Sequence, residues 1–401
     1  MLNMQKTNFR QFENDTGTIS LACYILCAIF FLIIGILPLL PGSFTQILRP
    51  LFILVSIVFP CHYYHMGRAS RMQLFYLLFF GIILISNELT GSAWRAYFSM
   101  VLFGLFFVFA SQHVWNRREI VLILKSVIIA GAICAVVLLI DNRELLELNN
   151  TTDLIFFTSQ KNRNAMAYSV APASVCSAVF FVYGINGRFS IAKRLFYAAT
   201  FTVCSFVVIA TGARSASVAM MVGVFLIGWE WAREGKTAEN SLFLKTFVVL
   251  ISLAILWLLI RFTAGTSSER IFNDLGDVNG REGLWEFAKE LIRQKPIFGG
   301  GFDYWDNMQG PSLGTHNTYL TIMVISGYTG AFFLTVLLAT IVLELLSVRN
   351  LIPFAFIIEL LLHTYSESSL DYYAYFPLVL AYILYSYIKY QNRDLSTLFI
   401  D

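Results

Sequence analysis

The sequence predicts an all-α, polytopic integral membrane protein with about twelve transmembrane helices. Of its 401 residues, 57% are hydrophobic and only 13% are charged, whereas a soluble domain carries roughly 25% charged residues. The apolar residues gather in runs of about 20, the length at which a helix crosses the hydrocarbon core of a bilayer. Because that core offers no water to backbone polar groups, runs of this length indicate helices and not barrel strands.

The expected spans make the whole chain, residues 1–401, a single transmembrane domain. The third and eleventh spans are short, and Gly327 and Gly330 are expected to break the long tenth span. The twelve spans cover residues 19–40, 44–60, 72–87, 93–113, 120–140, 165–183, 195–211, 215–231, 242–262, 318–346, 351–365 and 372–388.

The charged residues in the connecting loops predict the orientation. If the N-terminus is cytoplasmic, every inner loop holds a Lys or an Arg, and the outer loops are tight, acidic or long. This distribution follows the positive-inside rule along the whole chain and places both termini in the cytoplasm. The inner cations are Lys6, Arg10, Arg68, Arg71, Arg117, Arg118, Arg188, Lys193, Arg194, Arg233, Lys236, Arg349, Lys389 and Arg393.

Two outer segments, residues 141–164 and 263–317, are longer than simple connections require, and long ordered loops are usually functional. In the second, Arg281–Gln294 carries apolar residues at the spacing of an amphipathic helix lying against the membrane or the bundle. Pro296 is expected to end that helix, and three consecutive glycines, Gly299–Gly301, to form a flexible turn.

Four cations at the expected outer face are candidate ligands for phosphate: Lys161, Arg163, Arg214 and Arg281. Guanidinium groups bind phosphate oxygens in bidentate fashion, so several of them around an outer vestibule would suit a lipid diphosphate. Snorkelling toward lipid headgroups is the alternative for cations at this level. The alternative is weakest for Arg214, because the tight turn between two spans leaves its side chain little room to reach the headgroups.

His316 and Asn317 stand where the tenth span begins. An imidazole there can accept a proton from an attacking hydroxyl near neutral pH, and Asn317 can orient the ring or cap the helix. A helix-terminal residue without a catalytic role is the alternative for His316. The sequence contains no Asp-x-Asp pair, no HExxH and no Walker A motif, so it predicts neither a metal nor another cofactor.

Three stretches resemble motifs of the O-antigen ligase and polymerase superfamily of bacterial envelope glycosyltransferases. Ala210 to Ala216 resembles a Thr/Ser-rich turn with an arginine that opens a helix. The segment from Gly280 to Phe302 is similar to a "Gly-Arg … Trp … Pro-x-x-Gly-x-Gly" pattern. His316 to Leu320, with two glycines behind it, resembles a His-Asn pair followed by a glycine-containing helix. The stretch from Gln160 to Asn164 is a looser match, and the first half of the chain matches only in topology.

The resemblance implies a glycosyltransferase-C-like enzyme of the bacterial inner membrane. Such a protein takes a glycan from undecaprenyl diphosphate at the periplasmic face and joins it to a sugar hydroxyl without a nucleotide or an essential metal. His316 would be the general base, and Arg214 and Arg281 would bind the diphosphate leaving group. Lys161, Arg163 and Asn317 would bind substrate. Residues 263–317 would form a periplasmic loop that carries part of the active site.

Three functions remain open at this point. A ligase transfers the glycan to lipid A–core, whereas a polymerase transfers it to a second lipid-linked glycan. The single dominant outer loop resembles the ligase layout, and the Arg-x10-Gly repeat of some polymerases is absent. A transporter of lipid-linked sugars would predict charged residues at mid-membrane depth and discontinuous helices. Glu344 and Glu359 are the charged residues within the spans that such a reading would use. The expected partners are these substrates and membrane lipids, with no nucleic acid.

Overall fold

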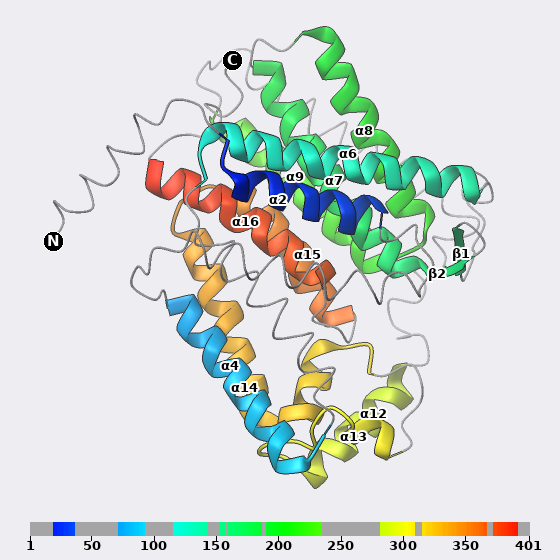
Figure 1. Ribbon diagram of the computed structural model, residues 1–401, viewed down its shortest axis with the longest axis vertical. Coiled ribbons are helices and arrows are strands. Elements are labelled where there is room, and N and C mark those ends of the chain that lie inside the picture. The colour runs from blue at the N-terminus through cyan, green and yellow to red at the C-terminus, as the bar shows by residue number, and fades with distance from the viewer. Residues whose placement is uncertain are drawn as a thin grey trace, which may run out of the picture.

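The computed structural model describes residues 19–36, 71–92, 115–142, 153–156, 159–186, 190–234, 281–308, 315–366 and 372–391. Three expected spans, residues 44–60, 93–113 and 242–262, lie outside the described residues. So does most of the outer loop before Arg281. The described part contains twelve α-helices, one π-helical turn and two short strands (Figure 1).

The helices alternate with short connections along the chain. They are α2 (Leu21–Phe30), followed by the π-helical turn η1 (Phe31–Ile36), then α4 (Arg71–Thr90), α6 (Arg117–Asp141), α7 (Arg163–Asn186), α8 (Ile191–Ala210), α9 (Arg214–Glu234), α12 (Arg281–Gln294), α13 (Tyr304–Asn307), α14 (Thr318–Leu346), α15 (Ile352–Ser366) and α16 (Tyr372–Gln391). The all-α prediction is therefore confirmed for the described part, with one exception.

The exception is a β-hairpin in the outer segment that the sequence presented as a plain connection. Strands β1 (Asp153–Phe156) and β2 (Ser159–Asn162) pair antiparallel, with Leu154 opposite Lys161. The hairpin leads directly into α7, which begins at Arg163.

Five described helices are long and apolar enough to cross a membrane: Arg117–Asp141, Met166–Tyr183, Ile191–Ala210, Ser215–Arg233 and Thr318–Leu346. Four further apolar helices are shorter. The third expected span is not short, however, because α4 extends over 20 residues. The eleventh is short, as expected, since α15 has 15 residues. The chain is an integral membrane protein.

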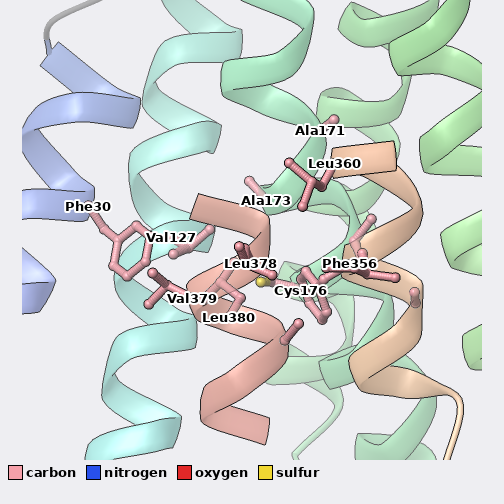
Figure 2. Close-up of a cluster of buried hydrophobic side chains, with 14 of the residues drawn as sticks. Phe30, Val127, Ala171, Ala173, Cys176, Phe356, Leu360, Leu378, Val379 and Leu380 are labelled. Atoms are coloured by element: carbon pink, nitrogen blue, oxygen red, sulfur yellow. The ribbon is translucent and has the colours of Figure 1, made fainter. Parts of the chain in front are cut away.

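Helix α7 lies at the centre of the main bundle and packs against α6, α8 and α9 (Figure 1). Of its most apolar stretch, 89% is buried, against 28% for α8, which lies at the periphery. Small residues allow the close approach: a Cβ on Gly131 of α6 would overlap the side chain of Ala173 on α7. Side chains from α2, α6, α7, α15 and α16 then fill the apolar interior (Figure 2). Close packing over small residues is how helices associate where lipid removes the hydrophobic drive.

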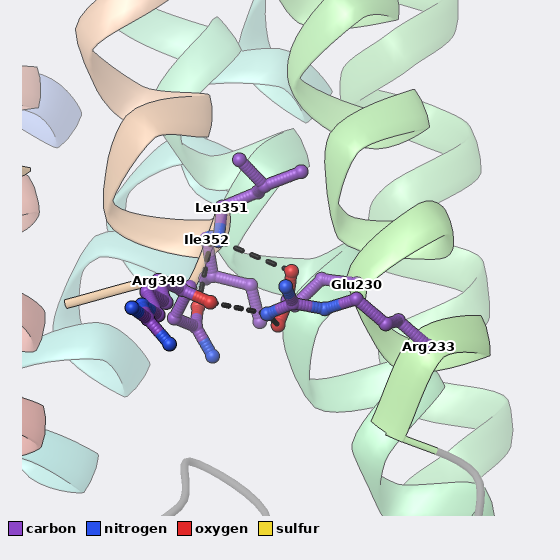
Figure 3. Close-up of polar contacts among 6 residues, drawn as sticks. Glu230, Arg233, Arg349, Leu351 and Ile352 are labelled. Carbon is purple, nitrogen blue, oxygen red and sulfur yellow. Dashed lines mark hydrogen bonds and ion pairs between the residues drawn. The ribbon is translucent and has the colours of Figure 1, made fainter. Parts of the chain in front are cut away.

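One end of the bundle collects residues from the loops that the sequence assigned to the inner side. Glu119, at the start of α6, closes a capping box with Asn116 and accepts a 2.9 Å hydrogen bond from the backbone of Ser20. At the same level Glu230 of α9 pairs with Arg233 and accepts a hydrogen bond from the N–H of Leu351, which precedes α15 (Figure 3). A carboxylate in this position satisfies an orphan donor at a helix N-terminus and interacts favourably with the helix dipole.

The opposite end collects residues from the expected outer loops. Helices α12 and α13 pack there on the first part of α14, and the outer end of α4 contacts the same segment. The described contacts thus join inner loops to inner loops and outer loops to outer loops, as the alternating topology requires. The candidate site lies at this second end.

Candidate functional site

The amphipathic helix of the outer loop has the bounds that the sequence predicted, Arg281–Gln294. Its apolar face packs on the first part of α14 in a small cluster built from Ala288, Leu291, Ile292, Tyr304 and Val324. Its opposite face is solvated and carries two exposed ion pairs, Lys289–Glu286 and Arg293–Glu290. The helix therefore rests on α14, and its ends are fixed relative to that helix.

Helix α14 is broken at Gly327, whose backbone adopts φ 65° and ψ −166°. The sequence predicted this break, although Gly330 stays helical. A break leaves backbone groups without helical partners, and the outer loop supplies them. Gly300 and Gly301 donate hydrogen bonds of 2.9 Å to the carbonyls of Val324 and Ile325, while the N–H of Tyr328 donates to the carbonyl of Pro296 at 2.7 Å. The N–H of Thr329 donates to the carbonyl of Ile297 at 3.3 Å.

These four bonds correct one prediction. The glycine turn is not flexible, because the backbone of Gly300 and Gly301 is tied to α14 and Gly299 bonds back to Lys295. The glycines are required by space: a Cβ on Gly299 would overlap the backbone of Ile325, and a Cβ on Gly300 would overlap the ring of Tyr304. We call residues 296–301 and 324–329 together the backbone seam.

The outer end of α4 supports the seam from the other side. Ser86 donates a 2.5 Å hydrogen bond to the carbonyl of Ile325. Asn87 accepts a bond from the backbone of Phe302 at 3.4 Å and donates to the carbonyl of Ser92 at 3.2 Å. Both residues are fully buried. The first part of α14 is thus held between α4, α12 and the glycine turn.

His316 lies immediately before that segment in a left-handed backbone conformation, with φ 48°. Its side chain is half-buried. On its C-terminal side Asn317 caps α14, because its side-chain oxygen accepts a 3.0 Å hydrogen bond from the N–H of Leu320. On its N-terminal side the hydroxyl of Thr315 accepts a bond from the N–H of Asn317 and lies 2.6 Å from the hydroxyl of Thr321. A non-glycine residue in this region persists only where its neighbours hold it.

Trp285 of α12 connects this turn to the outer helix. Its indole N–H donates a 2.9 Å hydrogen bond to the backbone carbonyl of Thr315. Its ring also meets the ring of Tyr365, at the outer end of α15, edge to face, with centroids 6.4 Å apart. Arg281 stands four residues before Trp285, so the two positions share one face of α12, separated by about 6 Å along its axis. The contact therefore places the backbone of Arg281 within one helical turn of the contact to Thr315.

Arg214 reaches the same end through α9, of which it is the first residue. Helices α9 and α15 run antiparallel: Glu230 meets Leu351, and a Cβ on Gly223 would lie 3.1 Å from the carbonyl oxygen of Ala355. Nine residues separate Gly223 from Arg214, and ten separate Ala355 from Tyr365. Continuing this register outward places Arg214 beside the end of α15 that carries Tyr365.

The structure thus brings the backbones of Arg214, Arg281, His316 and Asn317 onto neighbouring elements at one end of the bundle. The side chains of Arg214 and Arg281 lie outside the described residues, as do those of Lys161 and Arg163. Lys161 is in β2 and Arg163 opens α7, so both stand at the same end. The hairpin, however, packs on α6 and α7 and lies well apart from α12 and α13 in Figure 1.

Two groups of the outer loop have shifted acidities. Burial, and secondarily the charge of Glu290, raises the pKa of Tyr304, whose hydroxyl donates to Gln294 at 2.9 Å. The hydrogen bond from Lys289 lowers the pKa of Glu286. Among the residues that the structure describes, no three His, Cys, Asp or Glu side chains lie together as metal ligands would.

Sequence reasoning missed the roles of Trp285, Thr315 and Tyr365. Trp285 was visible as a member of the "Gly-Arg … Trp" motif, but its partner lies 30 residues away in sequence. Tyr365 carried no signal beyond its place at the end of an expected span.

A protein-family model described as O-antigen ligase matches residues 198–335. The match begins in α8 and ends after the break in α14, so it includes Arg214, Arg281, Trp285, His316 and Gly327. Lys161 and Arg163 lie before it. No curated protein matches the chain.

Proposed function

The chain carries an O-antigen ligase domain over residues 198–335, and on this premise we propose that it is a glycan-transferring enzyme of the ligase type. It takes a glycan from undecaprenyl diphosphate and joins it to a sugar hydroxyl of lipid A–core. The reaction takes place at the periplasmic face of the bacterial inner membrane, with both chain termini in the cytoplasm. The loop of residues 263–317 carries part of the active site.

In the proposed reaction His316 removes the proton of the acceptor hydroxyl as its oxygen bonds to the anomeric carbon. The bond from that carbon to the phosphate oxygen breaks, and undecaprenyl diphosphate leaves with the electron pair. A single displacement of this kind inverts the anomeric centre. Lys161 and Arg163 are proposed to bind the donor, and Asn317, which caps α14, to hold the turn and contact substrate.

Arg214 and Arg281 are proposed to neutralise the leaving diphosphate. Negative charge grows on it in the transition state, so fixed guanidinium groups stabilise that state more than the ground state. They act here without a metal or a nucleotide.

The observation that supports this assignment best is the left-handed backbone of His316. The residue is clamped between Thr315 and Asn317, one hydrogen bond from the helix that Arg281 opens. Strained non-glycine residues concentrate at functional sites, where the surrounding structure over-determines them. A plain helix-terminal residue would not require this clamp.

The same geometry weakens the transporter alternative. Broken helices in transporters present their free backbone groups to substrate or ions. In α14 the carbonyls of Val324 and Ile325 instead accept hydrogen bonds from the outer loop. Glu344, one of the charged residues within the spans, accepts a 2.9 Å bond from Tyr382.

The test uses purified protein in lipid nanodiscs with an undecaprenyl-diphosphate glycan, lipid A–core, and neither nucleotide nor metal. We expect product with inverted configuration. His316→Ala and Arg214→Ala should each lower turnover by about 10²-fold or more, while Arg293→Ala, in an exposed ion pair, should not. Wild-type turnover by His316→Ala would overturn the proposal. Product formed only with a second lipid-linked glycan as acceptor would instead identify a polymerase.

A further inference from the structure

We propose that Trp285 is a positioning residue that sets the backbone conformation of His316 and holds it in register with Arg281. This inference rests on the proposed function, since it assigns a task to a residue that touches neither substrate nor leaving group. Its physical content is a single hydrogen bond, from the indole N–H to the carbonyl of Thr315 at 2.9 Å.

The bond acts on a specific part of the turn. The carbonyl of Thr315 belongs to the peptide plane that joins Thr315 to His316. The next plane, from His316 to Asn317, is held by the bond from the N–H of Asn317 to the hydroxyl of Thr315. Because a residue's φ and ψ are the rotations between its two flanking planes, fixing both planes fixes the backbone of His316. Trp285 holds the first plane, and nothing within the turn itself replaces that bond.

The conformation that is held is one that His316 would otherwise leave. At φ 48° the Cβ of an L-residue crowds its own backbone, and an extended or right-handed conformation relieves the crowding. A change in φ would swing the imidazole away from its present direction, because the Cα–Cβ bond turns with the backbone. Loss of the indole donor therefore misdirects the proposed base without removing it.

Trp285 is itself well fixed. It lies mid-way along α12, whose apolar face is anchored on α14, and its ring is braced edge to face against Tyr365. Arg281 shares its helical face one turn earlier. A shift of α12 would thus move Arg281 and the carbonyl of Thr315 together, so that the proposed base and one proposed ligand of the leaving group keep their separation.

The experiment removes the donor and keeps the ring. Trp285→Phe loses the N–H, and replacement of Trp285 by 3-benzothienylalanine exchanges the N–H for sulfur at nearly unchanged shape. Trp305→Phe is the matched control, because Trp305 lies in the same loop and packs edge to face on Phe287 at 5.0 Å. Each variant is assayed in nanodiscs for turnover and for the KM of the donor, and its thermal unfolding is measured.

We expect both Trp285 variants to lose about tenfold to 10²-fold in kcat, with the KM of the donor nearly unchanged. Trp305→Phe should keep its kcat. In the double variant Trp285→Phe/His316→Ala the tryptophan change should add nothing to the loss caused by the histidine change, because the two act as a unit. Full additivity of the two losses, or a loss that merely follows the unfolded fraction, would overturn the inference.

A second readout does not depend on activity. Diethyl pyrocarbonate acylates accessible histidines, and mass spectrometry gives the rate at His316 alone. We expect Trp285→Phe to change this rate by about threefold or more, through the altered presentation of a half-buried ring, and Trp305→Phe to leave it unchanged. An unchanged rate in both Trp285 variants would overturn the inference. If His316→Ala retained full turnover while the Trp285 variants shifted the acylation rate, the proposed function would fail and the positioning would stand.

Discussion

The carbonyl oxygen of Ile297 occupies the place where a Cβ atom on Gly327 would stand. The two residues are 30 positions apart in sequence, yet the backbone of one fills the break in the helix that contains the other. Gly327 also has φ 65°, a value that L-residues rarely adopt. Both facts make the glycine a requirement of the backbone seam.

Gly327→Ala should therefore destabilise the protein by about 3 kcal/mol or more, through strain at positive φ and overlap with the loop backbone. The measurement is thermal unfolding in detergent. Gly81→Ala in α4 is the control, because a Cβ there meets nothing within 4 Å, and alanine in a helix interior should be neutral or stabilising by up to about 1 kcal/mol. Equal melting temperatures for the two variants would contradict the seam.

Arg281→Lys separates charge from geometry at the proposed leaving-group site. Lysine keeps the positive charge but lacks the planar fork that binds two phosphate oxygens at once. We expect turnover between that of the wild type and that of Arg281→Ala, which should lose about 10²-fold to 10³-fold. Arg293→Lys, on the solvated face of the same helix, should behave as the wild type. If Arg281→Ala were fully active, the arginine would have no part in the reaction.

Glu230→Ala tests the opposite end of the bundle. The side chain of Glu230 is 1% exposed, and it pairs with Arg233 at 2.5 Å and accepts from the N–H of Leu351. Arg233 also donates to the carbonyl of Arg349, which completes the cluster in Figure 3. Removing the carboxylate should cost about 1–3 kcal/mol of stability, because it leaves these donors without their partner.

The control for this variant is Glu290→Ala. That carboxylate forms an exposed pair with Arg293 at 3.0 Å, and exposed pairs contribute at most about 1 kcal/mol. Chemical denaturation of both variants should give clearly different midpoints. Similar midpoints would mean that the buried carboxylate is not a structural element of the inner end.

Alkaline pH should loosen the outer loop through Tyr304. Burial raises the pKa of this phenol above that of an unfolded tyrosine, about 10. The folded state therefore holds the phenolic proton more tightly than the unfolded state. The resulting stabilisation is fully present below pH about 10 and is lost as the pH rises through the folded-state value.

Tyr304→Phe should remove this alkaline loss, and it should also cost some stability at neutral pH because the bond to Gln294 disappears. Hydrogen exchange of α12 between pH 9 and 11, after correction for the intrinsic exchange rate, measures the effect. Tyr328→Phe is the control, since that side chain is 59% exposed. The same pH dependence in Tyr304→Phe and in the wild type would assign the loosening to another group.

Local signals in the sequence predicted the local features. The apolar spacing of α12 and the proline behind it fixed both ends of that helix, and a glycine within a long apolar run marked the break in α14. The inner and outer loops were separated by their Lys and Arg content. The hairpin at residues 153–162 was missed because its strands are four residues long and its turn, Phe157–Thr158, lacks the Asn-Gly or Asp-Gly pattern of tight hairpins.

The long-range features could not be predicted in this way. The bond between Trp285 and Thr315 joins two residues with no common period, and the seam is made of backbone groups that look alike in every sequence. The glycines at positions 299–301 predicted a turn, but only the packed structure shows that their missing side chains make room for α14. The positions of Arg214, Arg281 and His316 could be named from motifs, whereas their convergence required the packing of α9, α12 and α15.

The backbone seam also bears on how such a loop can diversify. Its four bonds use only N–H and carbonyl groups, which every residue but proline possesses, and its steric demands fall on a few glycines. Ile297 and Phe298 project outward, with 63% and 41% of their surfaces exposed. These two side chains can accordingly be exchanged for others suited to a different lipid or sugar surface while the joint beneath them keeps its shape.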